Sequence, residues 1–356
     1  MMQLYFDVQH LYYIPQYLPV LKELKEKGHK VSMVFYKEQD ECSRAVCCDF
    51  IDKNAIVAKW LTSASETFDF YQNSDADWVV FGNTFVGAEN LNKKTVLMQH
   101  GIGPKQCYYD VSNNKMTVRF VEGEHRLQRL KMLYPEGNFI DSGYAKLDPI
   151  INQTLGTINL KNLGLDPTKK TLLYAPTFYP SSLECFSDDF PEHFDEFNII
   201  VKPHFFSLFK KKYKKQRLKL DKWANAKNVY LANEYDFDLT PFLELADIMI
   251  SDASSAIFEF AALEKPVIWC DFYKLRWSYR GIFSYRLKAR LDEDIKYFNE
   301  LCARAGSYKD LKYLLSSSFN ESAEFKEKRK EIVYKLAGIT DGHSAKRIVS
   351  YLEEHQ

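Results

Sequence analysis

The sequence lacks the features that mark several classes of protein. Its seven cysteines include no CxxC pair and no Cys/His group with the spacing of a zinc site. Their odd number and irregular spacing predict reduced thiols in a cytoplasmic protein. No stretch offers the ~18 apolar residues that a membrane-spanning helix needs. The N-terminus also lacks the basic start and unbroken apolar run of a secretory signal. We therefore expect a cytoplasmic protein that is soluble or peripherally bound to a membrane.

An excess of charge of one sign is also missing. Lys plus Arg and Asp plus Glu both number 48, so no overall field draws the chain to nucleic acid, and any anion site must be local. The exception is "FKKKYKKQRLKLDKW", residues 209–223, which concentrates cations. The ordinary interpretation is a solvated helix face. The alternative is that Lys210–Lys219 contacts anionic lipid, on the inner face of the plasma membrane.

The composition that is present is typical of a globular protein with two domains. The chain has 356 residues, and 46% of them are apolar. Short apolar runs alternate with helical patterns, which predicts parallel sheets covered on both faces. We expect an α/β protein with two doubly wound, Rossmann-like domains facing a central cleft. The expected strands are 4–8, 31–36, 78–82, 95–101 and 117–123 in the first half, and 171–178, 197–204, 228–233, 247–252 and 266–271 in the second.

Ligands of such sheets bind at the carboxyl ends of the strands, where loops and helix N-termini meet. His100 lies at such an end, in "QHGIGPK", before glycines that permit tight turns. A histidine in this place suits a general base, and Lys105 suits contact with a phosphate. The alternative is a buried histidine that only orders its loop.

The second half has corresponding features. "VKPHFF" puts Lys202 and His204 at one strand end, and "YAPTF" offers the hydroxyl of Thr177 at another. Each motif by itself is ordinary turn chemistry. Two histidines on opposite walls of a cleft would suit the attacking and the leaving oxygen of a transfer reaction.

The most specific stretch is "SDASSAIFEFAALEKP", which reads as the end of a strand, a turn and a helix. Ser254 and Ser255 fall at the helix start, where N–H groups and the helix dipole favour an anion. One serine would cap the helix, and the second favours a phosphate or diphosphate site. We include Ser251 and Asp252 in that site. Glu259 either contacts the same ligand or is a surface charge.

Arginines form one further candidate group. Arg280 lies among aromatic residues in "RWSYRGIFSY". A guanidinium fork suits phosphate oxygens, and pairing with acidic residues is an equal alternative.

These motifs, taken in order, resemble those of the CDP-glycerol glycerophosphotransferase family, which builds teichoic-acid-type polymers of wall and capsule. The segments that carry the resemblance are "HGIGPK", "SGYAKLD", "LLYAPTF", "VKPHFF", "YDFDLTPFLELADIMISDASSAIFEFAALEKPVIW" and "YRGIF". The resemblance implies a glycosyltransferase B fold. It further implies an acceptor-side domain over 1–155, a nucleotide-donor domain over 156–320, and C-terminal helices over 321–356 that return to the first domain.

The resemblance also implies roles for individual residues. His100 would deprotonate the acceptor hydroxyl, and His204 would lie near the donor diphosphate. Ser254 and Ser255 would hold that diphosphate, with Glu259 near the donor hydroxyls. The arginine of "YRGIF" would neutralise phosphate charge.

The expected reaction moves glycerol phosphate, or another alditol phosphate, from a CDP-alditol to a hydroxyl of a lipid-linked or saccharide acceptor. CMP is released. Positioning and electrostatics dominate such chemistry. The sequence has no Asp-rich metal motif, so we expect no obligatory metal or other cofactor. The alternatives are a glycosyltransferase of the same fold with a nucleotide-sugar donor, and a non-catalytic binding module that keeps the fold.

Overall fold

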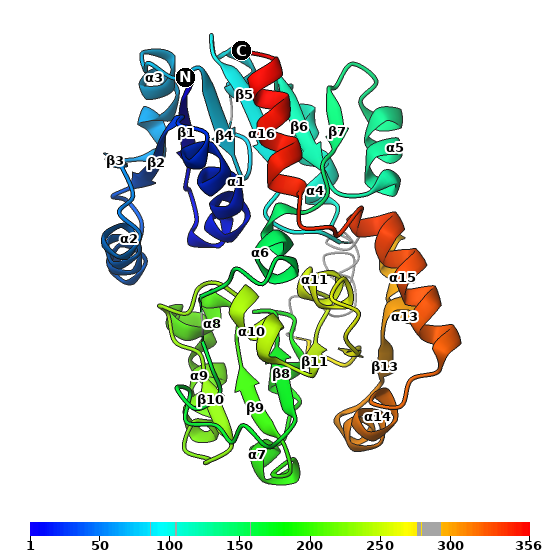
Figure 1. Cartoon of the computed structure of the whole chain (residues 1–356). Coiled ribbons are helices and arrows are strands. Elements are labelled where there is room, and N and C mark those ends of the chain that lie inside the picture. Colours follow the sequence, from blue (N-terminus) through cyan, green and yellow to red (C-terminus); the bar gives the residue numbers. More distant parts are fainter. Residues whose placement is uncertain (86, 104, 157, 276–278, 280–292) are drawn as a thin grey trace. The chain divides into compact units, whose positions relative to one another are not determined.

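A computed structural model describes residues 1–356 except 86, 104, 157, 276–278 and 280–292. The chain divides into two compact units, and each is described by itself (Figure 1). The first unit contains Met1–Gly101, Cys107–Thr154 and Lys335–Gln356, and the second contains Ile102–Gln106 and Leu155–Tyr334. One crossing between the units therefore falls after Thr154, inside the polar stretch that follows the first group of strands.

The first unit is built on a seven-stranded parallel sheet with the order β3-β2-β1-β4-β5-β6-β7. The order reverses between β1 and β4, which are neighbours in the sheet although they are not consecutive in the chain. Such a reversal is the switch point at which doubly wound sheets bind ligands. The strands are β1 (Gln3–Asp7), β2 (Lys30–Tyr36), β3 (Ala58–Leu61), β4 (Trp78–Phe81), β5 (Lys94–Met98), β6 (Val118–Val121) and β7 (Phe139–Asp141).

Helices connect these strands, because a parallel neighbour can be reached only by a long crossover. The first helix, α1, has Pro15 in its first turn, where the missing N–H costs no hydrogen bond. It ends before Gly28, whose φ of +80° suits a helix C-terminus. The described helices of this unit are α1 (Ile14–Glu26), α2 (Glu41–Lys53), α3 (Thr67–Gln72), α4 (Cys107–Asp110), α5 (Glu124–Leu133), α6 (Asp148–Ile151) and α16 (Ser344–Glu354).

The C-terminal helix α16 is an integral part of the first unit. It lies beside α1 (Figure 1), and Glu353 near its end contacts His29 at 2.9 Å. At its start, the backbone N–H of Ala345 donates to the buried carboxylate of Asp148 at 2.7 Å. The chain thus closes its N-terminal unit with its own last helix.

The second unit is built on a six-stranded parallel sheet with the order β10-β9-β8-β11-β12-β13. This is the Rossmann order 3-2-1-4-5-6, with its switch point between β8 and β11. Buried apolar side chains from these strands and from the flanking helices form its core. The strands are β8 (Thr171–Ala175), β9 (Asn198–Val201), β10 (Val229–Leu231), β11 (Ile248–Ser251), β12 (Val267–Cys270) and β13 (Ala303–Ala305).

The described helices of the second unit complete the doubly wound arrangement. The last of them, α15, runs on to Ala337, so its final three residues are grouped with the first unit. They are α7 (Phe190–His193), α8 (Phe205–Phe209), α9 (Lys214–Trp223), α10 (Thr240–Leu245), α11 (Ala256–Ala261), α13 (Phe298–Leu301), α14 (Leu311–Ser318) and α15 (Ala323–Ala337).

The predicted α/β class with two Rossmann-like sheets is confirmed. All ten expected strands are present, although most are shorter than the apolar runs that predicted them. Three further strands, β3, β7 and β13, were not predicted. Each is three or four residues long and lies at the edge of its sheet. An edge strand has one neighbour and needs no continuous apolar run, so its sequence carries little signal.

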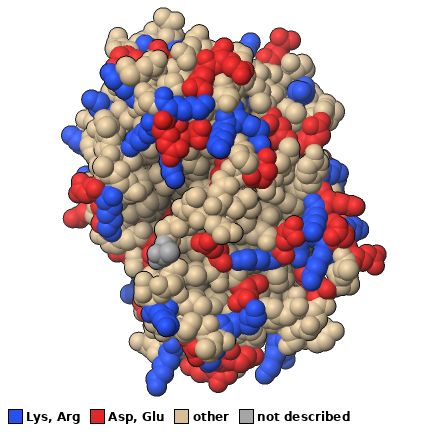
Figure 2. All heavy atoms as spheres, in the orientation of Figure 1, with Lys and Arg blue, Asp and Glu red and all other residues tan. Residues whose placement is uncertain are grey.

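The charged side chains are mixed in sign over the face shown in Figure 2. Lys and Arg lie next to Asp and Glu at most places there, in line with the balanced composition. Within the part of the chain that the structure describes, no helix has the length and apolar character needed to cross a membrane.

Candidate active site

His100 follows β5 at the carboxyl edge of the first sheet and is half-buried. Its Nδ1 lies 3.0 Å from the carbonyl oxygen of Gly82, the residue after β4. Because a carbonyl can only accept, Nδ1 carries the proton, and Nε2 of the neutral ring holds the basic lone pair. The amide nitrogen of Gln99 lies farther from Nδ1, at 3.4 Å, so the shorter contact decides the tautomer. This tautomer is the one that a general base acting through Nε2 requires.

Aromatic rings surround His100. The ring of Tyr13 stacks on the imidazole with centroids 4.8 Å apart, while those of Tyr12 and Tyr108 lie at 4.9 and 5.6 Å. The hydroxyl of Tyr144 donates to the main-chain oxygen of His100 at 3.0 Å. Burial raises the pKa of Tyr12 and of Tyr13 above the ordinary value of 10.0, so both phenols are neutral at neutral pH. These rings orient the imidazole without placing a charge beside it.

A buried carboxylate, Asp7, ends β1 next to β4. Its Oδ2 accepts hydrogen bonds from the hydroxyls of Tyr36 and Tyr71, the second at 2.8 Å. Its Oδ1 has no partner among the described residues. Burial raises the pKa of Asp7 from 3.8 to about 6, and the two phenol bonds oppose that rise. Sequence reasoning missed this residue, although an acidic residue that ends the apolar run "LYFD" was a usable signal.

The glycine loop after His100 is divided between the two units. Residues 102–106 are grouped with the second unit. Gly103 has a φ of +115°, and a Cβ atom there would lie 2.7 Å from the ring of Phe258 in α11. Only glycine satisfies both the backbone angle and the close contact. Lys105, which is half-buried, therefore belongs with α11 and the second sheet.

The switch point of the second sheet is held together by Ser251 and Asp252. The hydroxyl of Ser251 donates to the main-chain oxygen at the end of β8 at 2.7 Å. Asp252 accepts from the backbone N–H of Thr177 at 3.0 Å and the hydroxyl of Ser181 at 2.9 Å. It also accepts from the backbone N–H of Ser182 at 3.1 Å. Both side chains are fully buried.

These contacts correct the expectation that Ser251 and Asp252 touch phosphate. Their polar atoms bond the loop after β8, so the geometry gives them the task of shaping that loop. Burial raises the pKa of Asp252 from 3.8 to about 6, and the surrounding hydroxyl and N–H donors oppose the rise. The sequence placed both residues correctly at a strand end, but a single sequence cannot show which way a side chain faces.

His204 lies just after β9, at the same edge. Its Nδ1 accepts from the backbone N–H of Phe206 at 3.2 Å, which caps α8. The neutral ring therefore carries its proton on Nε2, the reverse of His100, and Nε2–H suits donation to a phosphate oxygen. The backbone N–H of His204 donates to the oxygen of Pro176 at 3.2 Å, which joins the loops after β8 and β9. Lys202, only 8% exposed, adds a cation at the same strand end.

The start of α11 uses one of its two serines. The hydroxyl of Ser254 accepts from the backbone N–H of Ala256 at 3.3 Å. The hydroxyl of Ser255 has no partner among the described residues, and neither has the backbone N–H of residues 253–255. The hydroxyl of Thr177, after the neighbouring strand β8, is equally unused by the described part of the chain. These half-buried donors form a cradle suited to an oxyanion.

Comparison with known proteins identifies the family to which this chain belongs. The sequence profile of the family described as CDP-Glycerol:Poly(glycerophosphate) glycerophosphotransferase matches residues 15–354, nearly the whole chain. The chain belongs to this family. A curated relative, the teichoic acid glycerol-phosphate primase of Bacillus spizizenii, is 32% identical over 111 residues. That match covers 30% of this chain and 26% of the primase, so the chain aligns with about a quarter of its relative's length.

Solved structures share the fold at low sequence identity. The wall teichoic acid polymerase TagF matches with a TM-score of 0.64 and 15% identity, over 99% of this chain and 88% of that one. A variant of TagF soaked for 15 minutes with CDPG matches with a TM-score of 0.68 and 14% identity, with the same coverage. A UDP-GlcNAc 2-epimerase from Neisseria meningitidis bound to UDP-GlcNAc matches with a TM-score of 0.66 and 15% identity. This match covers 99% of this chain and 100% of the epimerase. The glycerophosphotransferase-family chain therefore has the glycosyltransferase B type of fold.

The two remaining predicted site residues are Glu259 and Arg280. Glu259 is only 1% exposed, so its interpretation as a solvated surface charge is wrong. It lies inside α11, between Phe258 and Phe260 in the sequence. Arg280 lies outside the described residues.

The cation-rich stretch is partly structural. The guanidinium of Arg217 donates to the main-chain oxygen of Leu208 at 2.7 Å. The ammonium of Lys219 donates to that of Phe186 at 2.7 Å and lies 3.6 Å from the carboxylate of Asp188. Burial lowers the pKa of Lys219. At least two of the cations between Lys210 and Lys219 are therefore engaged by the protein itself.

No three His, Cys, Asp or Glu side chains come together as a metal site would require, within the residues that the structure describes.

Proposed function

We propose that the protein transfers glycerol phosphate from CDP-glycerol to a hydroxyl of a teichoic-acid-type acceptor and releases CMP. Family membership over residues 15–354 supports the donor class. The observation that carries the chemistry is the opposite tautomers of the two strand-end histidines. His100 offers a basic Nε2, and His204 offers an Nε2–H donor. A transfer to a hydroxyl needs one group of each kind.

In the proposed reaction, Nε2 of His100 takes the proton of the acceptor hydroxyl. The acceptor oxygen forms a bond to the β-phosphorus of the donor, and the bond from that phosphorus to the bridging oxygen breaks. CMP leaves with the electron pair of that bond. Little covalent work falls to the protein, so its contribution is mainly positioning and charge stabilisation.

The second sheet supplies the proposed donor site. Ser255, Thr177 and the backbone N–H groups of residues 253–255 would hold the diphosphate, and Ser254 would hold the helix start in shape. Lys105 and Lys202 would add positive charge, and Glu259 would stand close to the glycerol hydroxyls. Asp252 would support this site indirectly, through the loop after β8.

We also propose that the second unit binds the nucleotide donor and that the first binds a lipid-linked or saccharide acceptor. No metal is assigned to the reaction, because cationic side chains and N–H groups suffice to offset the diphosphate charge. A protein of this kind would act in the cytoplasm, at the inner face of the plasma membrane where such acceptors are anchored.

The decisive experiment measures CMP release from CDP-glycerol by the purified full chain, with and without an acceptor carrying terminal glycerol phosphate. We expect release that depends on the acceptor and continues in the presence of EDTA. CDP-ribitol and UDP-GlcNAc are run in parallel. Turnover of UDP-GlcNAc alone would establish the nucleotide-sugar alternative, and binding without turnover of any donor would establish the binding module. Loss of activity with EDTA and its return with Mg²⁺ would show that a metal is needed.

A further inference from the structure

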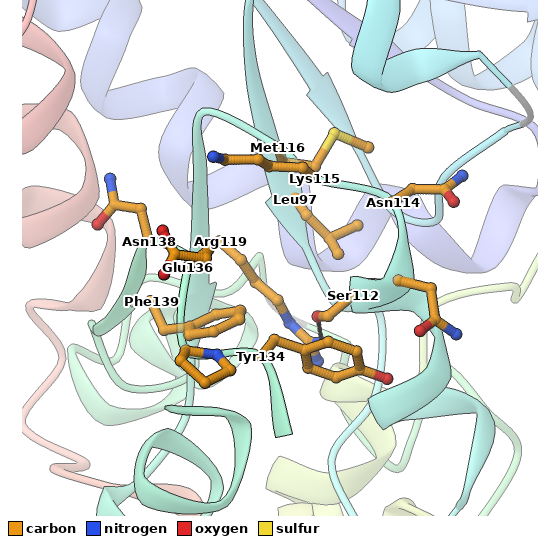
Figure 3. A pocket seen from close by; sticks show the side chains of 13 residues that line it. Leu97, Ser112, Asn114, Lys115, Met116, Arg119, Tyr134, Glu136, Asn138 and Phe139 are labelled. Atoms are coloured by element: carbon orange, nitrogen blue, oxygen red, sulfur yellow. Dashed lines mark hydrogen bonds between the residues drawn. The ribbon is translucent and has the colours of Figure 1, made fainter. Parts of the chain in front are cut away.

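A cavity of about 220 Å³ lies in the first unit (Figure 3). This is the liquid volume of about seven water molecules. Two loops line it, residues 112–116 before β6 and residues 134–138 before β7. Both loops belong to the amino edge of the parallel sheet, whereas His100 follows β5 at the carboxyl edge. The cavity is therefore separate from the candidate active site.

One wall of the cavity is a row of three side chains across the sheet. Leu97 of β5, Arg119 of β6 and Phe139 of β7 are partners in register, so they project from the same face. Two of these are the apolar residues that a buried sheet face calls for. Arg119 is the exception, because it is 2% exposed and carries a full charge into this row.

The guanidinium of Arg119 is incompletely partnered. It donates to the hydroxyl of Ser112, beside which it lies in Figure 3, and to the main-chain oxygen of Tyr108 at 2.7 Å. Its Nε has no hydrogen-bond partner among the described residues. Two of the five N–H groups of a guanidinium are thus used. No carboxylate of the described chain forms an ion pair with it.

The surrounding charges do not compensate for Arg119. Glu122 is close enough to act on it, but Glu122 already pairs with Arg126 through an Nε–Oε1 contact of 2.5 Å. Lys115 and Glu136, which also line the cavity, are both exposed and of opposite sign. Among the described residues, the guanidinium of Arg119 is therefore a buried charge with no carboxylate paired to it directly. Burial lowers the pKa of Arg119 to about 9, which reflects the same cost.

We propose that this cavity binds a small organic oxyanion whose negative charge neutralises Arg119. Leaving a buried charge without a counter-ion is among the costliest arrangements in a protein, and a bound anion removes that cost. The rest of the lining suits the stem of such a molecule, because apolar Leu97, Met116 and Phe139 face the cavity next to the polar group of Tyr134. The ligand class is a carboxylate or a phosphate monoester on a short stem. This inference does not depend on the proposed transferase function.

The test uses the full chain, thermal unfolding and titration calorimetry. Benzoate represents the carboxylates, glycerol 3-phosphate represents the phosphate monoesters, and glycerol is the uncharged comparison. We expect one of the two anions at 10 mM to raise the Tm by a few degrees, since binding to the native state stabilises it. Arg119→Met should reduce the affinity for that anion at least tenfold. Which anion responds identifies the head group.

Two further variants make the outcome unambiguous. Lys202→Met removes a cation of the proposed donor site in the second sheet, so it should leave the affinity at the Arg119 cavity unchanged. Lys115→Gln alters an exposed residue at the cavity and should fold normally, with anion binding about threefold weaker. If Arg119→Met does not fold, the anion affinity of Lys115→Gln decides whether the cavity binds the anion.

The proposal is overturned by any of three results. The first is that neither anion shifts the Tm of the wild-type chain. The second is that Arg119→Met and the wild type respond equally to the anion. The third applies where Arg119→Met cannot be measured, and it is that Lys115→Gln binds the anion as tightly as the wild type. Because these readouts are binding and stability, they remain interpretable even if CDP-glycerol proves not to be the donor.

Discussion

The carboxyl edges of the two sheets make an instructive contrast. Both sheets share the strand order around their switch points, and both have a buried aspartate there. Asp7 is the last residue of β1, and Asp252 directly follows β11. Around Asp7 the partners are phenol groups, and around Asp252 they are backbone N–H groups and a serine hydroxyl. The first edge presents aromatic rings around a histidine, and the second presents unused hydroxyl and N–H donors.

This difference shows how one architecture acquires two chemistries. The strands and their order determine only where a ligand can bind. The residues just beyond each strand determine what it can be. An aromatic enclosure orients a neutral base, as at His100, whereas loops rich in donors favour an anion. The following predictions test whether the two edges differ in this way.

The largest effect should come from removing the histidines one at a time. His100→Ala removes the basic Nε2 and should lower kcat for CMP release by about 10²- to 10⁴-fold, with donor affinity retained. His204→Ala removes a donor and should weaken CDP-glycerol binding as well as turnover. Steady-state kinetics and calorimetry separate the two. His193→Ala, at an exposed histidine, is the control, and unchanged turnover in His100→Ala would refute the base assignment.

Removal of the carboxylate that shapes the donor loop should chiefly affect stability. Asp252→Ala leaves three donors of the loop after β8 without their acceptor and should cost roughly 3 kcal/mol of unfolding free energy. Donor affinity should fall with it. Chemical denaturation measures the first and calorimetry the second. Asp195→Ala, at an exposed aspartate, should change neither, and a normal donor affinity in Asp252→Ala would show that the loop needs no clamp.

Asp7 should control a pH dependence of stability. Its folded pKa, about 6, exceeds 3.8, so the folded state binds the proton more tightly. The resulting stabilisation is complete below about pH 3.8 and is lost as the pH rises through 6. In Asp7→Asn the amide oxygen can still accept from Tyr36 and Tyr71, and the titration disappears.

Denaturation at several pH values measures this effect. The unfolding free energy of Asp7→Asn relative to wild type should rise by about 2.4 kcal/mol between pH 4 and pH 7. Asp195→Asn should show no such trend. A constant difference between Asp7→Asn and wild type over that range would mean that Asp7 is not the titrating group.

The smallest predicted effects distinguish the two serines of α11. Ser255→Ala should weaken donor binding about tenfold without changing Tm, because its hydroxyl bonds nothing in the described part of the chain. Ser254→Ala should lower stability by about 1 kcal/mol, because it removes the hydrogen bond that the Ser254 hydroxyl accepts from the first N–H of α11. Calorimetry with CDP-glycerol and thermal unfolding give the two readouts. If the two variants show the same donor affinity and the same Tm, both serines serve only to cap the helix.

Much of the fold could be predicted from the sequence because its signals are local. Apolar runs such as residues 247–252 must be buried, and Pro15 and Gly28 mark the ends of α1. Three of the four edge strands, β3, β7 and β13, escaped prediction, since one neighbour and partial burial leave no apolar run. For the site, the position of His100 and His204 after strands was predictable, and their family resemblance is confirmed by the family match.

Local sequence patterns thus identify the strand ends and the residues that follow them, including a second serine at the start of α11 that capping does not explain. The direction in which these side chains face depends on the folded chain. Hydrogen bonds to partners elsewhere in the chain set the tautomer of His100 and turn Asp252 toward the loop after β8. His204 is the exception, because its partner is the nearby Phe206. The fold also buries Glu259. The fold likewise places the buried Arg119 beside a cavity, with no hydrogen-bond partner for its Nε among the described residues. Such facts depend on contacts between residues far apart in the chain, which no local pattern encodes.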